Sequence, residues 1–106
     1  MAFVTAIISN DIDTVKRYIQ QVNNTDSYDS TTLIWASYYS STEVCKLLID
    51  NGADVNRANI YAYTALICAS LNGHTETCKL LLENGADVNH VDKNGDTALS
   101  LAGKKL

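Results

Sequence analysis

The side chains of this sequence that could bind a metal ion or act in catalysis are its histidines, cysteines and carboxylates. The 106 residues include two histidines, three cysteines and twelve acidic residues. His74 and His90 have no second histidine, cysteine or carboxylate at a spacing typical of zinc ligands. The cysteines form no Cys-x-x-Cys pair and lie in apolar helical patterns typical of core positions; they are Cys45, Cys68 and Cys78. We therefore expect no catalytic residue, no metal site and no cofactor, and we predict that the protein is not an enzyme.

Two aspartates that resemble ligands belong to a repeated segment. Residues 51–56, Asn-Gly-Ala-Asp-Val-Asn, return unchanged as residues 84–89, an offset of 33. The segment follows a helical pattern and lacks the strand and the lysine of a P-loop, which argues against a phosphate-binding loop. Because Asp54 and Asp87 recur with this period, we interpret them as scaffold residues that make turn and inter-repeat contacts.

The period of 33 extends well beyond this segment. Residues 26–58 and 59–91 are identical at 18 of 33 positions without a gap, and another copy begins near Asp92. At the start of the chain the pattern is shorter by three residues, which are missing around Gln20 and Gln21. The sequence thus predicts a single domain of residues 1–106, with repeats at about 1–25, 26–58 and 59–91 and a partial fourth repeat at 92–106.

A repeat of this length with the fragments TALICAS, GHTE, CKLLL and NGADVN resembles the ankyrin repeat over essentially the whole chain. The sequence departs from the family pattern where a proline and a histidine usually follow the threonine of each repeat. Thr32, Ala65 and Ala98 stand at the proline position, and Ile34, Ile67 and Ser100 at the histidine position. The resemblance implies an all-α solenoid of stacked helix-turn-helix repeats, with about seven helices and three β-hairpin-like fingers.

Local signals place the helices and fingers within a repeat. Thr64 is expected to cap a first helix through its hydroxyl, and Gly85 to end a second helix in the left-handed conformation. Residues 88–96 then predict an extended finger that turns at an Asn-Gly dipeptide. Asp29 and Ala62 replace that glycine in the earlier fingers, so we expect their tips to turn differently or less tightly.

The two histidines and the C-terminal end carry separate expectations. The resemblance implies that His74, in the GHTE fragment, hydrogen-bonds to the backbone of another repeat, whereas His90 is expected to be a solvated loop residue. The last repeat lacks a second helix in this sequence. We therefore expect Leu99 and Leu101 to cover only half of the apolar face of the third repeat.

Tyrosine is the residue type whose placement the repeat scaffold does not explain. Five of the six tyrosines fall outside the repeated apolar positions, whereas Tyr18 and Trp35 are assigned to the core. The resemblance implies that such positions line a concave face that contacts a partner, and a rigid ring with a polar hydroxyl suits recognition. The alternative is that some rings cover neighbouring repeats. The partner-binding residues predicted on this basis are Tyr28, Tyr38, Tyr39, Tyr61, Tyr63, Leu71, Asn72, Lys93 and Asp96.

Charge and hydropathy limit the class of partner. The formal net charge of -4 opposes binding to nucleic acid, because that affinity comes largely from lysine and arginine. No apolar run approaches the ~20 residues that a membrane-spanning helix needs. The start of the chain also lacks the features of a secretion signal. We therefore expect no membrane partner and a cytoplasmic location, with the nucleus as the alternative.

The predicted function is recognition of a partner protein through the tyrosine-bearing face. One alternative is a regulatory or structural segment of a larger protein, an enzyme among the options, that packs through its open C-terminal face. Self-association through the same end is another. The pattern around Asn56 and Asn89 also resembles the one that asparaginyl hydroxylases modify in ankyrin repeats.

Overall fold

The computed structural model describes residues 2–39 and 41–104, in which all regular elements are helices. Met1, Ser40, Lys105 and Leu106, which the predicted repeats include, lie outside the described residues. The elements in chain order are α1 (Ala2–Ile8), α2 (Ile12–Arg17), the 3₁₀-helix η1 (Ile19–Gln21), α3 (Thr32–Tyr39), α4 (Thr42–Asp50), α5 (Ala65–Leu71), α6 (Thr75–Glu83) and α7 (Ala98–Lys104). The prediction of an all-α repeat architecture is confirmed.

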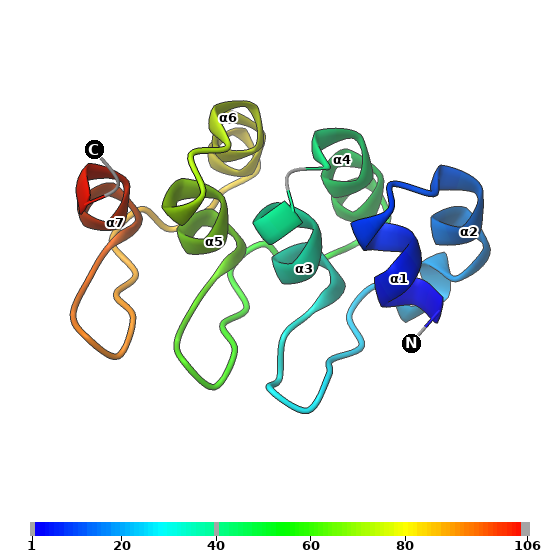
Figure 1. Ribbon diagram of the computed structural model, residues 1–106, viewed down its shortest axis with the longest axis horizontal. Coiled ribbons are helices and arrows are strands. Elements are labelled where there is room, and N and C mark those ends of the chain that lie inside the picture. Colours follow the sequence, from blue (N-terminus) through cyan, green and yellow to red (C-terminus); the bar gives the residue numbers. More distant parts are fainter. Residues whose placement is uncertain (1, 40, 105–106) are drawn as a thin grey trace.

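The helices form two rows, with the fingers on one side (Figure 1). The inner helices α1, α3, α5 and α7 lie side by side next to the fingers, and each packs against the next. The outer helices α2, α4 and α6 each pack against the inner helix that precedes them in the chain. The structure is therefore a stack of helix pairs whose loops project in a common direction.

Threonine side chains start three of the inner helices. In the residues before α3, α5 and α7, which are Thr31, Thr64 and Thr97, Oγ1 accepts a hydrogen bond from the backbone N–H three residues on, at 3.3, 3.3 and 3.2 Å. These bonds satisfy a backbone donor that a helix start leaves without an intrahelical partner. The predicted cap at Thr64 is confirmed.

The hydrophobic core lies between the two rows. Leu33 and Ile67 of the inner helices and Leu48 and Leu81 of the outer helices are almost completely buried. Ala36 and Ala69 occupy equivalent positions 33 residues apart and are fully buried, and their small side chains allow close packing of α3 against α5. Burial of these apolar side chains between successive helix pairs stabilises the stack.

The three finger tips share a single hydrogen-bonding scheme. In each finger Oδ1 of an Asp or Asn accepts from the backbone N–H two and four residues on, at 2.8–3.1 Å; these residues are Asp26, Asn59 and Asp92. Three residues after each of them a residue adopts positive φ, with values of 59°, 61° and 79° at Asp29, Ala62 and Gly95. The expectation that Asp29 and Ala62 turn differently is wrong, because the preceding side chain holds the same turn in every finger.

Asparagine side chains connect each repeat to the next one. The Asn23 amide donates to the Gly52 carbonyl at 3.0 Å, and its oxygen accepts from the Asp54 backbone N–H at 3.0 Å. Asn56 makes the same two contacts 33 residues further on, at 3.0 and 2.7 Å. The carboxylate of Asp54 in turn accepts from the Asn56 backbone N–H at 3.1 Å, so its predicted turn and inter-repeat roles are confirmed. Asn23 lies shortly after η1, the short helix found where the sequence predicts three missing residues.

Both histidines contact a backbone carbonyl oxygen earlier in the chain, His74 in the preceding repeat and His90 in the preceding finger. His74 Nε2 lies 3.0 Å from the Tyr38 carbonyl oxygen, which confirms the expected inter-repeat hydrogen bond. His90 Nε2 lies 2.9 Å from the carbonyl oxygen of Ala62, at the tip of the preceding finger. The expectation that His90 is a solvated loop residue is therefore wrong: its ring is partly buried and holds the tip of that finger.

Candidate partner-binding surface

Four tyrosines predicted to contact a partner are strongly exposed. The exposed fractions are 51% for Tyr28, 45% for Tyr38, 44% for Tyr39 and 49% for Tyr61. Tyr63 is partly buried and packs against the core. Together with Trp35 these rings form what we call the aromatic patch, defined by Tyr28, Trp35, Tyr38, Tyr39, Tyr61 and Tyr63.

The tips of two fingers supply one half of the aromatic patch. Tyr28 and Tyr61 stand 33 residues apart, so the repeat places them side by side, with ring centroids 6.0 Å apart in a stacked arrangement. The ring of Tyr61 also lies 6.3 Å from that of Tyr63. A row of rings therefore runs along the fingers instead of being dispersed over the surface.

The end of α3 supplies the other half. Trp35 and Tyr39 are one helical turn apart, and their rings stack with centroids 5.9 Å apart and planes 5° from parallel. Tyr38 meets Tyr39 edge-on at 5.1 Å. Trp35, assigned to a core position, packs against the core, but its side chain is partly exposed and also belongs to the patch. The four-residue spacing to Tyr39 is the signal that could have placed it there.

A groove of about 300 Å³ opens between the fingers and the inner helices within this patch. Its lining residues are Ser30, Ile34, Trp35, Tyr38, Tyr39, Asn59, Tyr63 and Cys68. None of these side chains is a carboxylate or a cation. Burial raises the pKa of the Cys68 thiol to about 12, so this thiol is neutral at pH 7. The groove is thus uncharged and walled mainly by aromatic rings.

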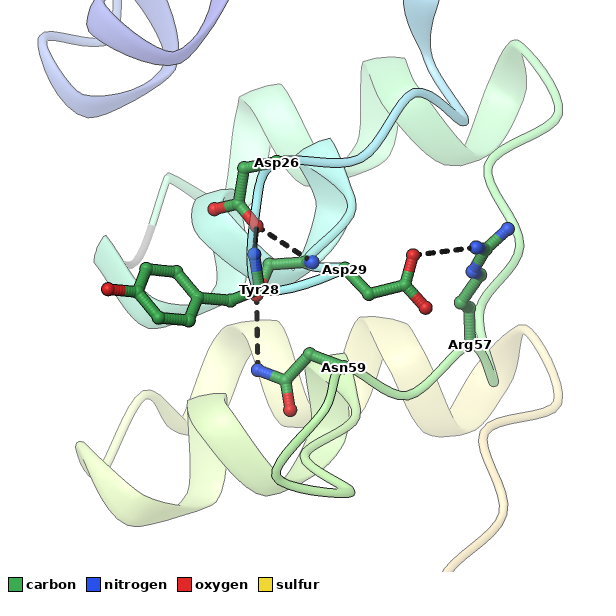
Figure 2. Close-up of polar contacts among 6 residues, drawn as sticks. Asp26, Tyr28, Asp29, Arg57 and Asn59 are labelled. Carbon is green, nitrogen blue, oxygen red and sulfur yellow. Dashed lines mark hydrogen bonds and ion pairs between the residues drawn. The ribbon is translucent and has the colours of Figure 1, made fainter.

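Polar contacts fix the finger tip that carries Tyr28 (Figure 2). The Asn59 amide donates to Ser30 Oγ at 3.1 Å, which joins two fingers. The Arg57 guanidinium pairs with the Asp29 carboxylate at 2.9 Å, with both side chains roughly half exposed. An ion pair so exposed contributes under about 1 kcal/mol to the stability of the fold, so it serves mainly to orient the finger tip. The Tyr28 ring points away from this ion pair.

The other predicted partner-binding residues lie towards the C-terminal end. Leu71 is the last residue of α5 and packs against the core. The Asn72 amide donates to the Cys68 carbonyl at 3.1 Å, so this side chain also has a structural role at the end of α5. In the third finger Lys93 is exposed, and the Asp96 carboxylate accepts from Ser100 Oγ at 3.2 Å.

A second groove, of about 290 Å³, lies at the C-terminal end of the stack. We call it the end groove; its lining residues are Leu66, Ser70, Cys78, Leu82, Val88, Ala98, Leu99 and Ala102. The apolar face of the third repeat is only partly covered, as expected: Leu101 is buried, whereas 82% of Leu99 is exposed at the edge of the groove. Leu66, one repeat before Leu99, is buried, so the later position lacks the cover that the earlier one has.

Other classes of site find no support in the residues that the structure describes. Residues 2–39 and 41–104 contain no cluster of three or more histidine, cysteine or acidic side chains that could hold a metal ion. Within the same residues no helix has the length and apolar character needed to cross a membrane. Cys45 and Cys68 are buried as predicted, and burial raises the pKa of the Cys45 thiol to about 11. Both thiols are therefore poor nucleophiles near neutral pH.

Comparison with known proteins agrees with this architecture. The family described as ankyrin repeats (many copies) matches residues 33–82 and 72–102, more than half of the chain. A search of curated proteins finds no match. Ankyrin repeats are generally protein–protein interaction modules and are typically non-catalytic. The period of 33, the paired helices and the family match together show that the chain belongs to the ankyrin repeat family.

Proposed function

We propose that this domain binds a partner protein through the aromatic patch and the adjoining positions of the later repeats. The observation that carries the proposal is the pair of ring clusters, one on two fingers and one on α3, that meet at a common groove and include four rings about half exposed. Rings that only covered neighbouring repeats would be buried. The proposed surface extends over Leu71, Asn72, Lys93 and Asp96. We further propose that the domain is divided into repeats at residues 1–25, 26–58, 59–91 and 92–106.

The mechanism is rigid presentation of a preformed surface. Each finger tip is closed by Asp26, Asn59 or Asp92, and the fingers are connected by side-chain bonds such as that from Asn59 to Ser30. Tyrosine rings have few rotatable bonds, and here they also pack against one another. Binding then orders little that was mobile, which lowers the entropic cost of association.

The test compares two surface variants of similar design. Immobilised protein captures partners, mass spectrometry identifies them, and titration calorimetry measures the Kd of an identified partner. One variant replaces Tyr28, Tyr38 and Tyr61 by serine, which removes three exposed rings and spares the more buried Tyr63. The control replaces Leu82 and Leu99 of the end groove by serine.

We expect the tyrosine variant to lose about 2 kcal/mol or more of binding free energy, as truncation of hot-spot aromatics does. We expect the control to bind like the unmodified protein, with both melting temperatures close to its own. If the tyrosine variant keeps full affinity, the proposed surface is wrong.

The end groove favours a second candidate function, packing against another domain or another copy of the chain. Its lining is almost entirely apolar, and Leu82 and Val88 at its border are about half exposed. In that case the Leu82→Ser, Leu99→Ser variant, and not the tyrosine variant, loses the partner. The same pair of variants therefore decides between the two functions.

A further inference from the structure

We propose that the groove of the aromatic patch accepts an arginine side chain from a basic segment of the partner protein. This inference rests on the proposed function and adds the chemistry of the group that enters the groove. Three features of the groove carry it: its aromatic faces, the negative charge next to them and its hydrogen-bond acceptors.

Aromatic faces provide the platform for a guanidinium group. Trp35 and Tyr39 are nearly parallel, Tyr38 stands edge-on to Tyr39, and Tyr63 contributes a ring from the adjacent finger. The negative face of a π system attracts a cation within about 6 Å, and indole does so more strongly than phenol or phenyl. Arginine is planar and weakly hydrated, so it stacks on such rings at a smaller desolvation cost than lysine.

The charges around the groove are complementary to a cation. The Asp26 carboxylate accepts a hydrogen bond from the Trp35 indole N–H at 2.8 Å, which places a negative charge directly beside this ring. Arg57, the basic residue of the neighbouring finger, is paired with Asp29 and does not line the groove. The helices α1, α3 and α5 contain no charged residue, and the chain as a whole carries a net charge of -4.

Hydroxyl oxygens supply acceptors for the guanidinium N–H groups. The side-chain hydroxyls of Tyr38, Tyr39 and Tyr63 make no hydrogen bond within the described residues. Ser30 Oγ already accepts from Asn59, whose own oxygen accepts from two backbone N–H groups. Among the side-chain hydroxyls of the groove, the phenol oxygens therefore remain available as acceptors, which suits a ligand group that only donates.

Two peptides that differ in charge but hardly in shape test the proposal. Trp35 is the single tryptophan of the chain, so intrinsic fluorescence reports on the groove directly. The protein is titrated with the peptide Ac-Gly-Arg-Gly-NH₂ and with the same peptide in which neutral citrulline replaces arginine. A third peptide with proline at that position tests an uncharged ligand for the aromatic walls.

We expect a saturable change with the arginine peptide, and at least about fivefold weaker binding of the citrulline peptide, because the cation–π term is lost. Equal binding of the two peptides, tighter binding of the proline peptide, or no saturable response to arginine at millimolar concentration would each overturn the proposal.

Substitutions separate the contribution of the aromatic rings to peptide binding from that of the negative charge. Tyr39→Phe keeps the ring but removes one of the three acceptor hydroxyls, so it should weaken binding of the arginine peptide less than Tyr39→Leu, which also removes the ring and should weaken binding several-fold. Asp26→Asn removes the charge next to Trp35 and should also weaken binding. Its turn remains feasible, because Asn59 holds the same turn in the next finger.

Asp92→Asn is the matched control, since it makes the same change in net charge at the equivalent position of the third finger. It should leave binding unchanged, and an equal loss in both aspartate variants would contradict the local role of Asp26. If the arginine peptide does not bind but the tyrosine variant loses the partner, only the arginine assignment is rejected. Retention of the partner by the tyrosine variant would reject the proposed function itself.

Discussion

Ala62 adopts a left-handed backbone conformation that glycine adopts with less strain. Its φ is 61°, and the same position holds Gly95 in the third finger. An L-residue in this region costs roughly 1–2 kcal/mol. Glycine removes this strain, but it offsets part of the gain because it raises the conformational entropy of the unfolded chain. The turn persists at Ala62 because Asn59 Oδ1 accepts two backbone hydrogen bonds across it.

We therefore expect Ala62→Gly to raise the free energy of unfolding by about 0.5–1 kcal/mol. The reverse change, Gly95→Ala, should lower it by a similar amount, because an added Cβ at Gly95 would meet no atom within 4 Å and only the backbone is strained. Urea unfolding followed by circular dichroism measures both. A less stable Ala62→Gly protein would mean that the Ala62 methyl group makes contacts that outweigh the strain.

At the scale of the element, the side chain of one asparagine makes a pair of contacts that connects the second repeat to the third. Asn56 donates to the Gly85 carbonyl and accepts from the Asp87 backbone N–H. Asn89 stands at the equivalent position one repeat later, is exposed, and makes no such pair of contacts within the described residues. The two residues thus have the same identity and local sequence and differ in what they connect.

We expect Asn56→Ala to lower the free energy of unfolding by about 1–2 kcal/mol, since two hydrogen bonds are lost and two backbone groups lose their partners. Asn89→Ala should change it by less than about 0.5 kcal/mol, as is typical of exposed positions. Chemical denaturation of both variants is the measurement. Equal effects would indicate that the asparagines act through their own turns and not between repeats.

The helices could be predicted from the sequence because their signals are local. The period of 33, the threonine caps and the apolar spacing each act within one repeat, and the structure has helices where these signals place them. The finger tips were harder to predict. A left-handed Ala62 contradicts its intrinsic preference, and only the side chain of Asn59, three residues earlier, explains why the turn persists.

The candidate site could be predicted only in part, because one of its rings departs from the equivalent residues of the other repeats. The exposure of Tyr28 and Tyr61 follows from their position in the fingers. The place of Trp35 does not follow, since its equivalents Cys68 and Leu101 are buried and the indole turns instead towards Asp26 and Tyr39. A repeat alignment assumes equivalent surroundings, and an indole at a position that holds Cys or Leu in the later repeats breaks that assumption.

At the scale of the whole molecule, the main contacts between the described helices join neighbours in the stack. Along the inner row α1 packs on α3, α3 on α5 and α5 on α7, so each central helix has two inner neighbours and α7 has one. Stability in such a stack is close to a sum of repeat terms and nearest-neighbour interfaces. The end that carries the end groove should therefore open more readily than the centre.

This asymmetry predicts different responses to two leucine truncations. Leu33→Ala, at a fully buried central position, should lower the free energy of unfolding by about 2–5 kcal/mol and raise amide exchange throughout the stack. Leu101→Ala should raise exchange in α7 and the third finger and leave α3 nearly unchanged, because α7 can detach without separating the other helices. Hydrogen exchange resolved by residue measures both. If Leu101→Ala instead raised exchange equally in every helix, the stack would unfold as one unit, and the apolar face of α5 that α7 covers would be exposed only on global unfolding.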